Sequence, residues 1–178
     1  MAMMQPNSIA VVAAAPEKTR SKDTYYPYKQ NTSLSYLCGF PEPESVMVII
    51  PDREQGEFVL FCRDKDPLRE TWDGYREGPE GAVHHYAADD AFPIDDIDDI
   101  LPGLLEDKDR VYYAIGKDAD FDKHLMDWVN NVRNLRGSDA MPPSEFVDLD
   151  HFVNEMRLIK TAGEIQLMRR SGEIAAQA

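Results

Sequence analysis

A run of consecutive apolar residues, VMVIIP at positions 46–51, constrains the fold of this chain more than any other feature. A strand without a polar face must be covered on both sides, which is typical of a sheet that lies between two layers of helices. The segment EFVLFC at positions 57–62 predicts the hairpin partner of this strand, because PDREQG between the two supplies a turn. The sequence therefore indicates a buried hairpin inside a layered domain.

Strands and helices alternate along the rest of the chain. Apolar segments at 9–14, 82–87 and 110–115 predict three more strands. Isoleucines and leucines recur at helical spacing in 95–106, where an internal proline predicts a kink or a break. The region 120–136 has its apolar residues on one stripe, aspartates at its start and arginines at its end, which predicts a long helix. We therefore predict an α/β fold, a mixed sheet of about five or six strands flanked by helices.

The composition excludes some classes of partner. The 178 residues, 43% of them hydrophobic, fit one ordinary globular domain with an appendage. The net charge of -14 argues against nucleic acid as a partner, because that affinity depends on lysine and arginine. The apolar run at 9–15 follows no basic residue and is too short to span a membrane. We interpret it as a buried strand, and we expect no membrane partner and a cytoplasmic location.

Groups that could carry chemistry are few. Hard cations bind carboxylate oxygens, but the acidic cluster of this chain lacks the spacing of a calcium loop and is better interpreted as a solvated helix surface. His84 and His85 would point to opposite faces of the expected strand, so they cannot chelate one ion together. Cys38 and Cys62 are expected to be reduced packing residues, although a disulfide stays possible. We predict no catalytic residue and no metal site. The acidic cluster consists of Asp89, Asp90, Asp95, Asp96, Asp98 and Asp99.

The most specific stretch is YPYKQNTSLSYLCGFPEPES at 26–45. Tyr36, Leu37 and Phe40 suit a strand that Gly39 interrupts and two prolines end. The order Gln-Asn, Tyr-Leu-x-Gly-Phe, Pro-Glu-Pro-Glu resembles the N-terminal domain of Xaa-Pro aminopeptidase (aminopeptidase P), whose relatives are prolidase and the creatinase-like proteins. Three further stretches agree in chain order: NSIA at 7–10, RDKDPLRETWDGYREGPEGA at 63–82 and EMRLIKTAGEIQLMRRSGEIA at 155–175.

The resemblance implies a creatinase/prolidase N-terminal domain in residues 1–160 and the start of a linker helix in 161–178. In that family a C-terminal catalytic domain of the pita-bread type holds two divalent metals, expected to be manganese, with two Asp, one His and two Glu. A metal-bridged water then hydrolyses the bond between an N-terminal residue and a following proline. The chain ends at Ala178 without that domain, so we expect this fragment alone to be inactive and to contain no cofactor. The implied partners are its own C-terminal catalytic domain, a homo-oligomer and, in the parent, a peptide substrate.

Trp72, Gly74 and Arg76 match the W-x-G-x-R stretch of the family. The resemblance implies that Trp72 reaches the active-site cleft of a neighbouring subunit. Arg76 would support it by pairing with a carboxylate of the loop or of the peptide. The residues alone favour equally an alternative in which Trp72 folds back on its own sheet, since a large aromatic side chain in a loop needs a cover.

The function expected from these observations is that of a non-catalytic N-terminal domain, serving oligomer assembly and shaping substrate access in a metal-dependent Xaa-Pro aminopeptidase. One alternative is the same domain of a prolidase or creatinase-like relative with another substrate. A second is a free-standing binding or scaffold module. The sequence from Thr161 onward, a helix that begins with a capping box but lacks a C-cap, speaks against this second alternative.

Overall fold

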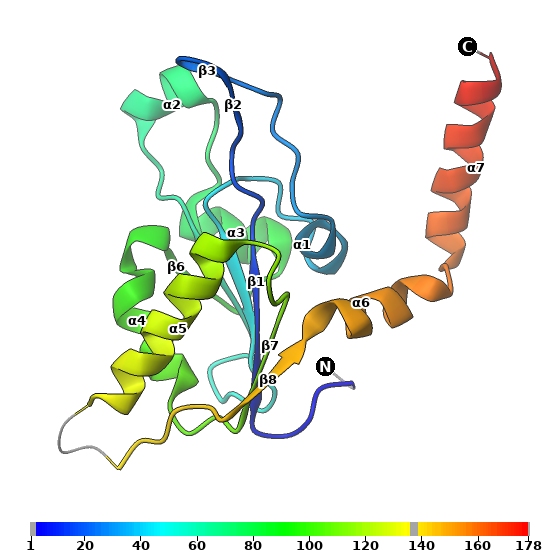
Figure 1. Cartoon of the computed structure of the whole chain (residues 1–178). Helices are drawn as coiled ribbons and strands as arrows, with labels where there is room; N and C mark the ends of the chain where they lie inside the picture. The colour runs from blue at the N-terminus through cyan, green and yellow to red at the C-terminus, as the bar shows by residue number, and fades with distance from the viewer. Residues whose placement is uncertain (1–2, 136–138, 178) are drawn as a thin grey trace.

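The structure is a computed structural model, and it describes residues 3–135 and 139–177. Its centre is a mixed six-stranded sheet with the strand order β6-β5-β4-β1-β7-β8 (Figure 1). The predicted α/β fold with five or six strands is confirmed. The strands of this sheet are β1 (Ser8–Ala13), β4 (Val46–Ile49), β5 (Phe58–Cys62), β6 (Asp90–Pro93), β7 (Arg110–Tyr113) and β8 (Glu145–Asp148). A separate two-stranded ribbon consists of β2 (Thr19–Ser21) and β3 (Thr24–Tyr25).

The pairing of the strands combines one predicted hairpin with parallel neighbours. β4 and β5 are antiparallel, with Val48 opposite Val59, so the predicted hairpin is confirmed. β1 is antiparallel to β4 on one side and parallel to β7 on the other. β5 with β6 and β7 with β8 are parallel, and such neighbours need crossover connections, which here contain helices.

Helices cover both faces of the sheet. Ile9 and Val11 of β1 lie in the core shared with α4 and α5, whereas Ala10 and Val12 face the core shared with α1, α3 and α6. The crossovers through α3 and α5 run toward opposite edges of the sheet, so right-handed connections put these two helices on opposite faces. The helices are α1 (Thr32–Leu37), α2 (Pro67–Asp73), α3 (Gly78–Tyr86), α4 (Ile97–Leu105), α5 (Ala119–Arg133), α6 (Leu149–Leu158) and α7 (Ala162–Gln177).

The prediction of a strand around Tyr36 is wrong, because this segment forms the helix α1. Asn31 caps the helix, and its Oδ1 accepts a hydrogen bond from the backbone N of Ser33 at 2.9 Å. Leu34 is fully buried, and Gly39 leaves the helix with φ +72°. The apolar residues of so short a segment fit either period, and the cap decides between them.

The strand expected at 82–87 is also wrong, since these residues belong to α3 and the turn after it. A proline in the first turn favours a helix start, and Ala87 ends the helix in the left-handed region with φ 57°. His84 and His85 are exposed on this helix rather than on two faces of a strand. The strand that occupies the sheet position expected for residues 82–87 is β6. Its four residues are only half-buried, so their sequence has no clear apolar pattern.

The two helices predicted from apolar stripes are confirmed in position. α4 follows a 3₁₀ turn, η1 (Ile94–Asp96). Of the two outcomes predicted at Pro102, a kink or a break, the break is wrong, because α4 continues through this residue. In α5 the buried residues are Leu125, Trp128, Val129 and Val132. The predicted end of this helix at position 136 and the following Gly137 lie outside the described residues.

The helix α7 has the predicted capping box but no buried residue. The Oε2 of Glu164 accepts a hydrogen bond from the backbone N of Thr161 at 2.7 Å, and the Oγ1 of Thr161 accepts one from Glu164 N at 3.3 Å. Leu167 and Met168 are exposed, and α7 stands away from the sheet (Figure 1). Within the described ranges, no helix is long and apolar enough to cross a membrane.

Candidate functional site

Trp72 lies near the end of α2, a short helix that is fixed at both ends. The Oδ1 of Asp66 accepts hydrogen bonds from two backbone N–H groups of the first turn, at 3.0 and 3.1 Å. At the other end Gly74 has φ 86° and ψ 175°, a region that only glycine adopts readily. No atom lies within 4 Å of the position that a Cβ would take, so the backbone angle, not lack of space, requires glycine here.

Replacing Gly74 by alanine should therefore lower the free energy of unfolding by about 1–3 kcal/mol, the usual cost of a side chain in this backbone region. The matched control is Gly103→Ala, because Gly103 lies inside α4 with equally open space around its Cα. That variant should be more stable by about 0.5–1 kcal/mol. Urea unfolding of both variants checks the prediction, and equal effects of the two substitutions would contradict it.

The side chain of Trp72 is 88% exposed, so the alternative in which it folds back on its own sheet is wrong. Large apolar side chains are also exposed on the β2–β3 ribbon and around α2, and Figure 1 shows these two elements beside each other at one end of the molecule. Tyr25 and Trp72 both line a cavity of about 450 Å³ between the two elements. Exposed apolar patches of this kind mark interaction sites. We call Tyr25, Tyr26, Leu68, Trp72 and Tyr75 the α2 surface.

Arg76 is only 8% exposed and faces its own loop. Its Nη2 donates a hydrogen bond to the Oδ2 of Asp73 at 3.1 Å, and its Nη1 lies 3.5 Å from the carbonyl oxygen of Asp64. Its Nε is buried and has no partner among the described residues. The guanidinium thus stabilises the turn after α2, and a role toward a peptide stays a prediction.

Glu42 connects this loop to the core, and no role for it was predicted from the sequence. It is 7% exposed and lies in the Pro-Glu-Pro-Glu stretch. Its Oε1 accepts a hydrogen bond from the backbone N of Glu77 at 2.7 Å, and its Oε2 lies 3.3 Å from the Nη2 of Arg63. A buried carboxylate 35 positions before Glu77 therefore fixes the segment that follows Trp72.

Gln30, the first residue of the Gln-Asn pair, holds several chain segments together through hydrogen bonds. Its Nε2 donates to the carbonyl oxygens of Phe40 and Glu42 at 3.1 and 2.8 Å. Its Oε1 accepts from the backbone N of Ala15 and of Asn31, at 3.0 and 2.7 Å. One side chain thus joins the end of β1, the start of α1 and the Pro-Glu-Pro-Glu stretch.

The acidic cluster does not form a metal site in the described part of the chain, where no group of three or more His, Cys, Asp or Glu could hold an ion. Its members have separate tasks instead. Asp90 pairs with Arg53 at 2.9 Å, and Asp98 accepts a hydrogen bond from the Nε1 of Trp128 at 2.6 Å. His85 pairs with Glu77 at 2.9 Å.

Both cysteines are free, as predicted. Burial, together with the nearby Glu42 carboxylate, raises the pKa of the Cys62 thiol to about 12. Burial also raises the pKa of Cys38. The nucleophile in cysteine chemistry is the thiolate, so neither side chain is a reactive group at neutral pH.

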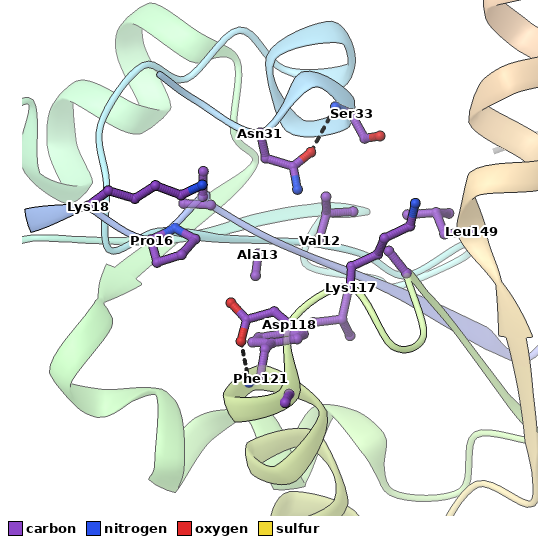
Figure 2. Close-up of a pocket in the computed structure, with 15 residues that line it drawn as sticks. Val12, Ala13, Pro16, Lys18, Asn31, Ser33, Lys117, Asp118, Phe121 and Leu149 are labelled. Carbon is purple, nitrogen blue, oxygen red and sulfur yellow. Dashed lines mark hydrogen bonds between the residues drawn. The ribbon is translucent and has the colours of Figure 1, made fainter. Parts of the chain in front are cut away.

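A second cavity, of about 480 Å³, lies at the carboxyl ends of β1 and β7 (Figure 2). The residues after β1 form one wall, and the start of α5 forms another. Asp118 caps α5 there, and its Oδ1 accepts hydrogen bonds from the backbone N of Asp120 and of Phe121 at 3.0 and 3.1 Å. Lys117 lies beside it, with its Nζ 2.9 Å from the Oδ2 of Asp150. No residue predicted from the sequence as functional lies in this cavity.

The fold is that of an aminopeptidase P N-terminal domain. The chain belongs to the aminopeptidase P N-terminal domain family, because the family described as "Aminopeptidase P, N-terminal domain" matches residues 1–112. Over 176 residues it is 40% identical to Xaa-Pro aminopeptidase of Escherichia coli, which covers 98% of this chain and 40% of that protein. Xaa-Pro aminopeptidase of Haemophilus influenzae is 33% identical over 175 residues, with 98% and 38% covered.

Solved structures agree with this assignment. The structure of Pseudomonas aeruginosa aminopeptidase PepP is 55% identical and superposes with a TM-score of 0.97, over 99% of this chain and 40% of that one. A low-pH form of aminopeptidase P from E. coli is 39% identical with a TM-score of 0.93. The chain thus spans about 40% of the length of these relatives.

Proposed function

We propose that this chain is the non-catalytic N-terminal domain of a metal-dependent Xaa-Pro aminopeptidase, and that it serves oligomer assembly and shapes substrate access. The observation that carries the proposal is the exposure of Trp72 on a helix that is capped at both ends. An aromatic side chain that is 88% exposed contributes little to the stability of its own domain, so a contact with another surface gives it a role.

The parent enzyme would hydrolyse the bond between an N-terminal residue and a following proline. The described residues include no group of metal ligands, so the two divalent ions, which we propose to be manganese, would be held by another part of the protein. This domain would instead narrow the entrance of a neighbouring subunit's site. Trp72 would form an apolar wall there, and Arg76 would keep the turn after α2 in place through Asp73.

The linker role proposed for 161–178 has support in the exposed apolar residues of α7. Leu167 and Met168 are mostly exposed and Ile165 is partly exposed, and an isolated helix of this length is marginal in water. Packing against the catalytic domain would bury them. The free thiols of Cys38 and Cys62 are consistent with a cytoplasmic protein.

The isolated 178-residue chain should bind no stoichiometric transition metal and cleave no X-Pro peptide, because its described residues offer neither a ligand group nor an activated nucleophile. Elemental analysis after dialysis against manganese, and a peptide assay with manganese added, check this prediction. A longer protein that contains this chain and the remaining length of its relatives is the positive control. A tight equivalent of metal, or turnover by the fragment above the blank, would show that the domain is itself catalytic.

A further inference from the structure

The cavity at the ends of β1 and β7 lies where the chain connections diverge. After β1 the chain continues to α1, which packs on one face of the sheet, and after β7 it continues to α5 on the other face. Because β1 and β7 are parallel neighbours, the two connections leave a crevice outside their carboxyl ends. Ligands of open α/β sheets bind at such a switch point.

The cavity has the size and the walls of a small-molecule site. Its volume of about 480 Å³ lies within the usual range of ligand pockets. Val12, Ala13 and Pro16 form an apolar wall on the side of β1, and Phe121 and Leu149 lie on the other sides (Figure 2). An apolar lining with a few polar groups is the common composition of such pockets.

Donor groups of Lys18 and Asn31 at this cavity have no acceptor among the described residues. Lys18 reaches toward the cavity, and its Nζ forms no hydrogen bond or ion pair with any described side chain (Figure 2). Asn31 caps α1 through Oδ1, which leaves both protons of its Nδ2 unused in the described part of the chain. Lys117, in contrast, is paired with Asp150.

An acceptor faces these donors from the opposite wall. Asp118 binds the start of α5 through Oδ1 alone, and its Oδ2 has no donor within the described ranges. Figure 2 shows Asp118 below the cavity, with Asn31 above it and Lys18 at the side. Lys18 and Asp118 form no ion pair with each other, so a positive and a negative group face the same apolar space separately.

We propose that this cavity binds a small zwitterion with an apolar body, an amino acid or a dipeptide. Lys18 and Asn31 would donate hydrogen bonds to its carboxylate, Asp118 would accept one from its ammonium group, and the apolar walls would contact its side chain. A simple anion would be repelled by Asp118 and a simple cation by Lys18, whereas a zwitterion satisfies both. The site belongs to this chain alone and does not depend on the proposed peptidase role.

Titration of the isotope-labelled 178-residue chain with L-leucine, followed by two-dimensional amide NMR, tests the proposal. We expect a dissociation constant of about 1 mM, which suits a ligand of this size, and shifts of amide signals at 13–15 and 117–121. N-acetyl-L-leucine lacks the ammonium group and L-leucinamide lacks the carboxylate, so each should bind at least about tenfold more weakly. Leucyl-leucine separates the two sources, since the tighter of the two zwitterions identifies the ligand class.

Three substitutions keep the fold while they remove one group each. Asn31→Asp and Asp118→Asn preserve the helix caps, because Asn and Asp cap equally well. Lys18→Gln removes an exposed amine without a partner among the described residues. Each should weaken L-leucine about tenfold, and Asp118→Asn should abolish the preference for L-leucine over its N-acetyl form. Lys123→Gln, an exposed lysine of α5 outside the cavity, is the matched control and should bind normally. No shifts up to about 20 mM ligand, or wild-type affinity of the Lys18 and Asp118 variants, would overturn the proposal.

Discussion

Replacing Glu42 by alanine should lower the free energy of unfolding by about 3–5 kcal/mol, the usual cost of leaving one partner of a buried ion pair alone. Glu42 and Arg63 are both largely buried, with 8% and 11% of their side chains exposed. The substitution leaves the Arg63 guanidinium, whose Nε already has no partner among the described residues, without its carboxylate. It also leaves the backbone N–H of Glu77 without its acceptor.

Two further variants separate these contributions. Glu42→Gln can still accept the hydrogen bond from Glu77 but carries no charge, so its loss should be smaller than that of Glu42→Ala. Glu54→Ala removes an exposed carboxylate that has no hydrogen-bond partner among the described residues, and it should change stability by less than about 0.5 kcal/mol. Urea unfolding measures all three. A Glu42→Ala variant as stable as Glu54→Ala would contradict the role given to this carboxylate.

Replacing Trp72 by alanine in the full-length parent enzyme should lower kcat/KM for X-Pro peptides. The expected loss of transition-state stabilisation is roughly 1–3 kcal/mol, the value of one well-packed apolar contact in substrate discrimination. The melting temperature should stay unchanged, because the side chain is 88% exposed in its own domain. The metal content should also stay unchanged, since no metal ligand group lies in the described residues.

The control for this experiment is Trp72→Phe, which keeps an aromatic face and should recover most of the activity. Ile115→Ala removes an exposed apolar side chain away from the α2 surface and should leave the kinetics normal. A Trp72→Ala protein with a lowered melting temperature and unchanged kcat/KM would indicate a structural role and contradict the proposed one.

The parts of the fold that could be predicted from sequence are those with long or fully apolar patterns. The β4–β5 hairpin follows from two uninterrupted apolar runs, and α5 follows from a stripe that repeats over four turns. In these elements local pattern and tertiary burial agree. A long segment repeats its apolar spacing several times, so its secondary structure can be assigned from sequence.

The secondary structure of short segments could not be predicted reliably, because it depends on which side chains are buried, and burial depends on distant residues. α1 has six residues, and its single fully buried side chain, Leu34, gives no period. The edge strands β6 and β8 have half-buried and exposed residues, so neither alternates clearly. In α3 the buried residues are two glycines and Ala82, so the segment has no stripe of large apolar residues that would indicate a helix.

Some residues of the candidate site could be predicted from sequence and others could not. Trp72, Gly74 and Arg76 could be singled out from sequence because they match the W-x-G-x-R stretch of the family, whereas the residues alone did not decide whether Trp72 is exposed. Glu42 could not, since its partner N–H at Glu77 lies 35 residues away. Lys18 and Asn31 were also missed, because only the fold brings them to one cavity.

The most direct test of the central claim, that Trp72 completes the site of a neighbouring subunit, is the activity of mixed oligomers. The full-length parent with Trp72→Ala is unfolded and refolded together with a second parent variant that keeps Trp72 but is inactivated in its catalytic region. Some catalytic sites then receive Trp72 from an inactive neighbour. We predict that kcat/KM per intact catalytic site rises several-fold above that of Trp72→Ala alone. Activity equal to the sum of the two separate proteins, in oligomers shown to be mixed, would contradict the claim.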